Sequence, residues 1–327
     1  MSKEIKIGLL GLGHLLVDLQ GLYLIHYMSN NLDFTYISIY FVIYNFIAFG
    51  LQPVFGYLAD RKNLYFLYII LGLLLPAIAI NFSTIGVIAI IVSTIGNAMY
   101  HVGGGVISIN LYPNKAAPAG IFVAPGAIGV FLGVQLALLD NSYALLISIV
   151  ALVIVILLYL TFKNQLPDNR YSPVKNQLGK LTILILLIVL IRGFVGMSII
   201  YPWKTNLYLS AFLVLGVFIG KFCGGILGDR LGYKKIGISG LVLSLPFILA
   251  GYYVSVIGII GALLFNLTMA ITLYYIIYSF GKYKGFAFGL TTLALFISYL
   301  PNILGLSFEY NLVYYIVLIV LVGLAVY

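Results

Sequence analysis

Charged residues and cysteine are scarce in this chain of 327 residues, and histidine is rare. Only 8% of the residues are charged, and Asp and Glu together number eight. The single cysteine, Cys223, excludes an internal disulfide and any metal site built from several thiolates. The three histidines, His14, His26 and His101, are dispersed along the chain, and this dispersion predicts that they form no metal site.

Motifs of soluble enzymes are also missing. No Gly-Lys-Ser or Gly-Lys-Thr phosphate-binding loop occurs, so the chain is not an ATPase by itself. No dinucleotide fingerprint follows a strand, and His14 with Asp18 is the one pair that approaches a nucleophile-base arrangement. We therefore expect no cofactor and no enzymatic activity.

Apolar residues make up 63% of the chain, and the mean hydropathy is +1.16. This composition is typical of a polytopic membrane protein. A membrane-spanning helix takes about 20 apolar residues, so we predict an all-α integral membrane protein with twelve transmembrane helices. The predicted helices cover residues 5–28, 34–58, 64–81, 84–111, 116–139, 143–163, 180–203, 205–228, 234–253, 255–280, 284–307 and 309–327.

The longest polar stretch, residues 164–179, falls at the midpoint of the chain. We interpret it as a cytoplasmic linker between an N-terminal six-helix half, 1–163, and a C-terminal six-helix half, 180–327. The first apolar segment begins directly after Lys6 without a small-residue cleavage pattern. It is therefore predicted to be a retained helix rather than a signal peptide.

The basic residues are distributed unevenly over the predicted loops. Loops on the side of the N-terminus hold almost all of them, whereas the opposite loops hold Lys204 and the acids Asp33, Asp140 and Glu309. The positive-inside rule then places both termini in the cytoplasm and the chain in the cell membrane. Because the net charge of +9 is spread over many short loops, it predicts no nucleic-acid partner.

An internal repeat appears at a constant offset of 169 residues. Its best-preserved part is a polar turn at the end of an apolar segment. The matched pairs are Gly56 and Gly225, Leu58 and Leu227, Asp60 and Asp229, Arg61 and Arg230, Asn97 and Asn266, Lys115 and Lys284, and Gly120 and Gly289. Both halves have the same predicted topology, so we expect them to be related by an axis along the membrane normal.

These features resemble the major facilitator superfamily, whose signature after helices 2 and 8 is G-x-L-A-D-R-x-G-R-K. The copy at 225–235 fits closely. In the first copy, Asn63 stands where Gly is usual and the following basic pair is missing. The resemblance implies two pseudo-symmetric six-helix bundles that alternate in access, and a gating motif made of Gly56, Asp60, Arg61, Gly225, Asp229 and Arg230.

An acid can face the positive N-terminal end of a neighbouring helix. We expect Asp60 to contact the helix from 284 and Asp229 to contact the helix from 116, with unequal gating because the first copy is degraded. The alternative is a solvated loop whose charges only set topology.

A narrower resemblance is to the fosmidomycin-resistance-type efflux proteins. It rests on the segments 13–18, 100–104 and 191–196. Where that group typically has Phe-His-Pro-Glu-Gly, Val102 and Gly103 replace the Pro and the Glu. The stretch from Gly120 to Gly129, with Pro125 inside it, is similar to the Gly-Pro motif of superfamily antiporters, or is simply a kinked and tightly packed helix.

Ionisable side chains inside a bilayer are candidates for function. Asp18 and His14 share one helix face and are predicted to couple transport to protons, because a neighbouring cation changes how readily a carboxylate holds a proton. Arg192 is predicted to bind an anionic group of the substrate, together with His101, Asn266, Lys221, Tyr23 and Tyr100. Three alternatives stay open: a static ion pair of Asp18 with Arg192, histidines that only pack in the core, and a Lys221 that extends to the membrane surface.

The sequence thus predicts a secondary active transporter of a small anionic or amphipathic compound, working by proton-coupled efflux. One alternative is uptake of a small anionic metabolite by proton symport. Another is a lipid scramblase or receptor with the same fold. The predicted partners are the small-molecule substrate, protons and membrane lipid, and the predicted state is a monomer.

Overall fold

The computed structural model describes residues 1–29, 34–139, 143–164, 166 and 179–303, and its regular elements are all helical. The helices of the N-terminal half are α1 (Lys3–Ser29), α2 (Phe34–Asn45), the π-helical turn η1 (Phe46–Gly50), α3 (Gln52–Lys62), α4 (Tyr65–Ala79), η2 (Ile80–Ile85), α5 (Val87–Leu111), α6 (Ala117–Leu139) and α7 (Tyr143–Phe162). Those of the C-terminal half are α8 (Lys180–Ser198), η3 (Pro202–Thr205), α9 (Leu207–Leu231), α10 (Tyr233–Ala250), α11 (Ser255–Asn266), α12 (Thr268–Ser279) and α13 (Lys284–Ile303).

Eleven helical stretches of the described residues are long and apolar enough to cross a membrane. They coincide with the first eleven predicted helices, and the predicted twelfth helix, 309–327, lies outside the described residues. Most of the predicted linker 164–179 lies outside them as well. The chain is a multi-pass membrane protein.

Three predicted helices differ from the structure. The predicted helix 34–58 is divided by η1 and continues to Lys62, and the predicted helix 255–280 is interrupted at Leu267. The predicted helix 180–203 ends at Ser198, where Ile199 is extended, and Pro202 begins the short helix η3. Short π-helical turns often accompany functional sites, and η1 contributes Phe49 to the cavity described below.

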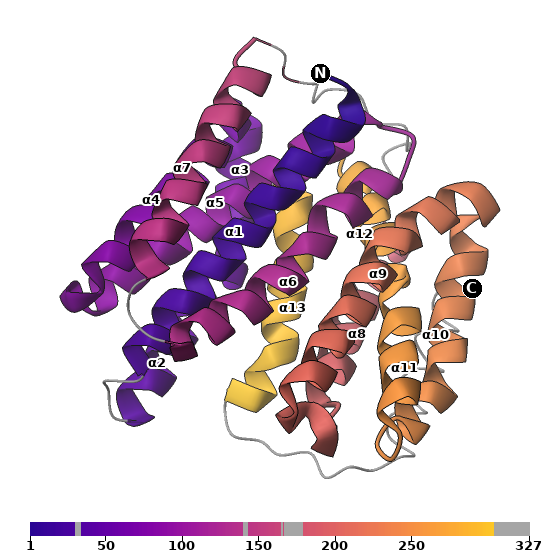
Figure 1. The fold of residues 1–327 in the computed structure, drawn as a ribbon. Helices are drawn as coiled ribbons and strands as arrows, with labels where there is room; N and C mark the ends of the chain where they lie inside the picture. Colours follow the sequence, from indigo (N-terminus) through magenta and orange to yellow (C-terminus); the bar gives the residue numbers. More distant parts are fainter. Residues whose placement is uncertain (30–33, 140–142, 165, 167–178, 304–327) are drawn as a thin grey trace.

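The two halves pack against each other along two helix pairs, α6 with α9 and α3 with α13 (Figure 1). Repeated glycines allow this close approach. A Cβ atom on Gly120 of α6 would lie 2.5 Å from the carbonyl oxygen of Lys221, and one on Gly289 of α13 would overlap Pro53. Since Gly120 and Gly289 are a matched pair of the repeat, the duplication supplies both contacts.

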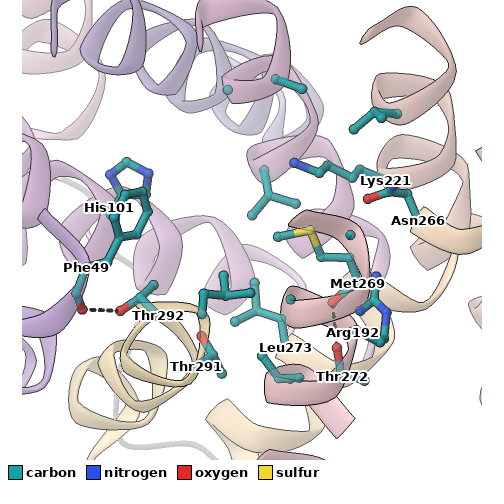
Figure 2. Close-up of a pocket in the computed structure, with 18 of the residues that line it drawn as sticks. Phe49, His101, Arg192, Lys221, Asn266, Met269, Thr272, Leu273, Thr291 and Thr292 are labelled. Carbon is teal, nitrogen blue, oxygen red and sulfur yellow. Dashed lines mark hydrogen bonds between the residues drawn. The ribbon is translucent and has the colours of Figure 1, made fainter. Parts of the chain in front are cut away.

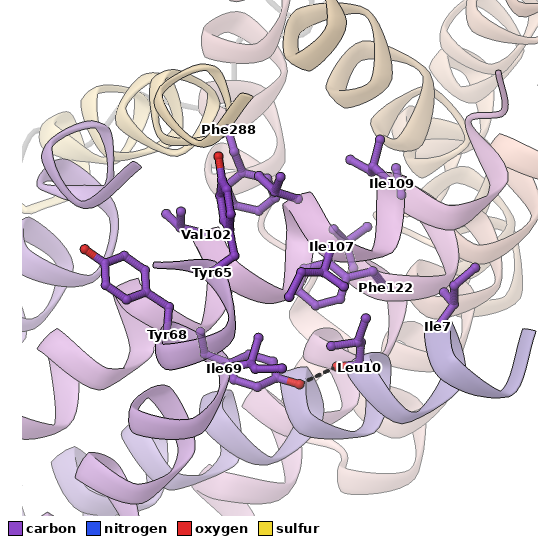
Figure 3. Close-up of a cluster of buried hydrophobic side chains, with 14 of the residues drawn as sticks. Ile7, Leu10, Tyr65, Tyr68, Ile69, Val102, Ile107, Ile109, Phe122 and Phe288 are labelled. Carbon is purple, nitrogen blue, oxygen red and sulfur yellow. Dashed lines mark hydrogen bonds between the residues drawn. The ribbon is translucent and has the colours of Figure 1, made fainter. Parts of the chain in front are cut away.

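The largest hydrophobic core is centred where α1, α4, α5 and α6 meet, and it extends to residues of α12 and α13 in the other half (Figure 3). Leu10, Ile69 and Phe122 are fully buried there. In contrast, Leu145 on α7 and Ile183 on α8 are 65% and 70% exposed, as expected of side chains that face lipid.

Candidate functional site

Asp60, at the end of α3, caps the N-terminus of α13. Its Oδ1 accepts the backbone N–H of Gly285 at 2.9 Å, and its Oδ2 accepts that of Phe286 at 2.8 Å. The hydroxyl of Tyr65 donates a further hydrogen bond to Oδ1. The first N–H groups of a helix have no partner within the helix and attract negative charge, so the predicted contact between Asp60 and the helix from 284 is confirmed.

Asp229 makes the equivalent contact in the second copy. Its two carboxylate oxygens accept the N–H of Ala116 at 2.8 Å and that of Ala117 at 3.0 Å, at the start of α6. Tyr233 donates to the same carboxylate at 2.7 Å. The predicted contact with the helix from 116 is therefore confirmed. We call the end of the bundle that holds Asp60 and Asp229 the motif end.

The glycines of the motif are explained by these contacts. A Cβ atom on Gly56 would overlap the carbonyl group of Gly285, and one on Gly225 would overlap that of Ala116. Asn63 ends α3 in the left-handed conformation, with φ 53° and ψ 48°, which Asn tolerates better than most residues. The first copy thus keeps its turn without the usual glycine.

The two arginines of the motif make no contact between the halves among the described interactions. Arg230 is exposed, and Arg61 is exposed with its guanidinium over the ring of Tyr57 in the same helix. Because the two acids bind equal sets of donors, the unequal gating expected for the degraded copy is not visible in this conformation and stays a prediction.

Two further hydrogen bonds join the halves at the motif end. Lys284 donates to Asn110 Oδ1 at 2.5 Å, and Tyr278 donates to the carbonyl of Ile109 at 3.2 Å. Lys284 is fully buried, whereas Lys115, its counterpart in the repeat, is exposed. Lys284 is a matched position of the repeat in the sequence, but its burial depends on how the halves pack.

A cavity of about 430 Å³ lies between the halves. Residues of α1, α5, α6 and η1 line one wall, and residues of α8, α9, α11, α12 and α13 line the other. Figure 2 shows His101 and Phe49 facing Lys221, Asn266 and Arg192 across this space. The ionisable side chains that line it come from α1, α5, α8 and α9.

The first wall carries a buried polar cluster, which we call the Asp18 cluster: His14, Asp18, Asn97 and His101. His14 Nε2 lies 3.2 Å from Asp18 Oδ2, and His101 Nε2 lies 3.6 Å from Oδ1. Asn97 donates to Oδ1 at 3.1 Å. One carboxylate thus lies between two imidazole rings. His14 is 5% exposed and His101 is 6% exposed.

Two of the three histidines, which are far apart in the sequence, lie together in space. The rings of His14 and His101 lie 4.4 Å apart between centroids, because α5 packs against α1. One ligand atom from each of His14, Asp18 and His101 lies within 4.8 Å of the others. These residues could therefore hold a metal ion, contrary to the expectation from the sequence.

The second wall is positively charged. Arg192 is 8% exposed, and its Nη2 donates to the carbonyl of Phe265 at 3.2 Å while its Nε has no hydrogen-bond partner. Lys221 lines the cavity on the same side, so its side chain does not extend to the membrane surface. Asp18 pairs with the two histidines and not with Arg192 among the described interactions, so a static pair of Asp18 with Arg192 is absent in this conformation.

Four of the six predicted substrate-binding residues line the cavity: Arg192, His101, Asn266 and Lys221. The predictions for Tyr23 and Tyr100 are wrong. Tyr100 is buried in the core and donates to the carbonyl of Leu10 at 2.8 Å, and Tyr23 is buried against the ring of Tyr27.

Sequence reasoning missed Asn97, Phe49 and Gly126 as site residues. A Cβ atom on Gly126 would lie 2.6 Å from both Asp18 Oδ2 and His14 Nε2, so this glycine leaves space beside the cluster. In the sequence, Asn97 could be recognised by its match to Asn266 in the repeat, and Gly126 by its place in the Gly-Pro stretch. No sequence feature pointed to Phe49.

No family model matches this chain, and no curated protein sequence does. Solved structures do match it over nearly the whole length. A variant of the E. coli fucose:proton symporter has 13% identity and a TM-score of 0.70, with 100% of this chain and 98% of that chain covered. A major facilitator superfamily transporter in the outward conformation has 14% identity and a TM-score of 0.63, with 98% of each chain covered.

A third structure, a bacterial homologue of the iron transporter ferroportin in an outward-facing state, has 16% identity and a TM-score of 0.61. It covers 100% of this chain and 97% of that chain. All three solved structures are transporters rather than enzymes, and none supports the narrower resemblance to fosmidomycin-resistance proteins, which stays a prediction. The fold of this chain is the major facilitator fold.

Proposed function

We propose that this chain is a secondary active transporter that moves a small organic anion across the membrane by alternating access. The observation that carries the proposal is Arg192, a buried guanidinium in the cavity between the halves whose Nε has no partner. A buried donor without a partner is costly, and the planar fork of Arg matches carboxylate and phosphate groups. Lys221 adds a second positive charge to the same wall.

Alternating access is supported by the closure of one end of the cavity. At the motif end, Asp60 and Asp229 each bind the N-terminus of a helix in the other half. The predicted topology makes this end cytoplasmic, so the structure would be closed to the cytoplasm. Release of both contacts would let the halves rock about the central cavity and open it to the cytoplasm.

The proposal includes proton coupling through Asp18 and His14. Asp18 is the one acid among the described residues that line the cavity, and it lies on the wall opposite the positively charged one. The direction we propose is efflux. A second candidate is proton symport. It is supported by one protein of similar fold, which is named a fucose:proton symporter.

Ligand screening by thermal stability tests the anion site. A ligand that binds the folded state at 100 times its Kd stabilises it by about 2.7 kcal/mol, so small carboxylates and phosphonates that bind should raise the unfolding temperature of purified protein. We expect Arg192→Gln to abolish this effect. Lys163→Gln, which removes an exposed positive charge at the end of α7, should leave it unchanged. Stabilisation that is equal in Arg192→Gln and wild type would refute the assignment of Arg192.

Flux in proteoliposomes tests transport and its direction. An imposed pH gradient should drive the anion found in the screen. Movement against the proton flow indicates efflux by antiport, and movement with it indicates symport. Asp18→Asn should remove the dependence on the gradient while anion binding persists. Lipid-probe scrambling without anion flux would instead support the scramblase alternative.

A further inference from the structure

The Asp18 cluster has an arrangement of donors and acceptors that calls for a positive charge at its centre. Nδ1 of His14 lies 2.8 Å from the carbonyl oxygen of Phe122, and Nδ1 of His101 lies 2.9 Å from that of Asn97. A carbonyl oxygen only accepts hydrogen bonds, so each Nδ1 must carry a hydrogen atom. In a neutral ring the lone pair is then on Nε2.

Both Nε2 atoms face the carboxylate of Asp18, at 3.2 and 3.6 Å. Two lone pairs directed at an anion repel it unless a cation lies between them. Water cannot relieve this repulsion fully, because His14, Asp18 and His101 are all less than a tenth exposed. Protons on the rings would supply the positive charge, and so would a metal ion.

The surroundings match those of metal sites in two respects. A histidine that binds a metal usually donates its other ring N–H to a carbonyl or carboxylate, which fixes the ring, and both rings here do so. The carboxylate is also fixed, because Asn97 donates to its Oδ1. These partners hold the three ligand groups, whose ligand atoms lie within 4.8 Å of one another, before any ion arrives.

Space for an ion is kept open beside the ligand atoms by Gly126 of α6. A Cβ atom there would lie 2.6 Å from both Asp18 Oδ2 and His14 Nε2, and the cavity reaches all three ligand residues. An ion can therefore enter from the cavity. The ligands of a tetrahedral zinc ion, at about 2.0–2.2 Å from the metal, lie roughly 3.3–3.6 Å from one another. The two Nε2 atoms lie 3.2 and 3.6 Å from the nearer oxygen of Asp18, so small movements would bring the ligand atoms to this spacing.

We propose that His14, Asp18 and His101 bind a divalent first-row transition-metal ion, which replaces protons in the cluster. Two imidazole nitrogens and one carboxylate oxygen suit Zn²⁺, Co²⁺ or Ni²⁺. Three protein ligands leave a coordination position open toward the cavity, where an anion can complete the shell. The bound ion would hold the cluster in one charge state, so it would stop coupling through Asp18.

The open position also relates the metal to the cationic wall. One carboxylate balances half the charge of a divalent ion, and Arg192 and Lys221 line the same cavity. An anionic cargo would meet positive charge on both sides. The metal site itself does not depend on the proposed transport, because it follows from the geometry of the cluster alone.

Direct metal binding tests this proposal with full-length protein that carries no histidine tag. Titration with Zn²⁺ by calorimetry, and with Co²⁺ by visible absorption, should show one ion bound per chain and the absorption of tetrahedral Co²⁺. His14→Gln and His101→Gln should each weaken binding at least tenfold. Gly126→Ala, which keeps all three ligands and fills the space beside them, should also weaken it. His26→Ala is the matched control, since His26 lies outside the cluster, and it should bind as wild type does.

The outcomes separate this proposal from the proposed function. Absence of Zn²⁺ and Co²⁺ binding by folded wild-type protein would overturn the metal site, and so would equal affinity in wild type and His101→Gln. Anion-driven stabilisation that depends on Arg192 would persist in either case. Conversely, metal binding that depends on the cluster, without any anion binding, would leave the metal site standing and remove the proposed cargo.

Discussion

Replacement of Asp229 by Asn tests whether the contact between α9 and α6 holds the motif end closed. The carboxylate accepts two backbone N–H groups and the hydroxyl of Tyr233. Asn keeps one acceptor oxygen and turns an N–H₂ group toward the second backbone N–H. The closed state should lose one or two charge-assisted hydrogen bonds, each worth roughly 1.5–3 kcal/mol.

A loss of about 1.5–6 kcal/mol shifts the balance between closed and open states by roughly tenfold to 10⁴-fold, at about 1.4 kcal/mol per factor of ten. Transport should fall because one state is depopulated, while membrane insertion and yield stay normal. The same reasoning applies to Asp60→Asn, whose two backbone partners lie at the start of α13.

Pulsed EPR distances between the halves measure this shift. Spin labels on cysteines at Lys163 and Lys235, both exposed at the motif end, report its opening in a Cys223→Ser background. We expect a longer distance population in Asp229→Asn than in wild type. Glu4→Gln is the control, because Glu4 also lies at this end but bonds Tyr112 within its own half. Identical distance distributions in wild type and Asp229→Asn would refute the gating role.

Two more changes test the packing at the motif end and the anion site. Gly56→Ala should also open the motif end, because its Cβ would overlap the carbonyl group of Gly285, whereas Gly8→Ala, with nothing within 4 Å of its Cβ, should not; equal EPR distances in both variants would contradict this. Arg192→Lys keeps the charge but loses the planar fork, so a ligand titration should show carboxylate affinity weaker by about tenfold, or roughly 1.4 kcal/mol. Unchanged affinity in Arg192→Lys would mean that only charge matters there.

The contacts of the motif end could be predicted from the sequence because they follow from local rules applied twice. An acidic side chain at the end of one helix can accept hydrogen bonds from the free N–H groups at the start of another. The repeat offset places Asp60 and Asp229 in equivalent positions. The structure confirms both partner helices. The pairing of His14 with Asp18 was predictable for a similar reason, since residues four apart share a helix face.

The rest of the site depends on how whole helices rotate and pack. Tyr100 and His101 are neighbours in sequence, but successive residues point about 100° apart around a helix. His101 therefore faces the cavity while Tyr100 faces the core and bonds Leu10. The meeting of His14 with His101, and the space left by Gly126, needed the packing of α5 and α6 on α1.

The acids of the two motif copies bind similar sets of donors. The copies differ in the residue that directly precedes the bound N–H groups. The first copy lacks the glycine turn and the basic pair of the second, yet Asp60 binds as many donors as Asp229. Directly before its two N–H donors stands Lys284, which is buried and bonds Asn110 in the other half, whereas Lys115 is exposed at the equivalent place. The charge missing from the turn after Asp60 is thus replaced by a cation on the helix that Asp60 binds. Loss of the signature residues in one copy therefore need not weaken that side of the gate, since the cross-half bond of Lys284 strengthens the same contact.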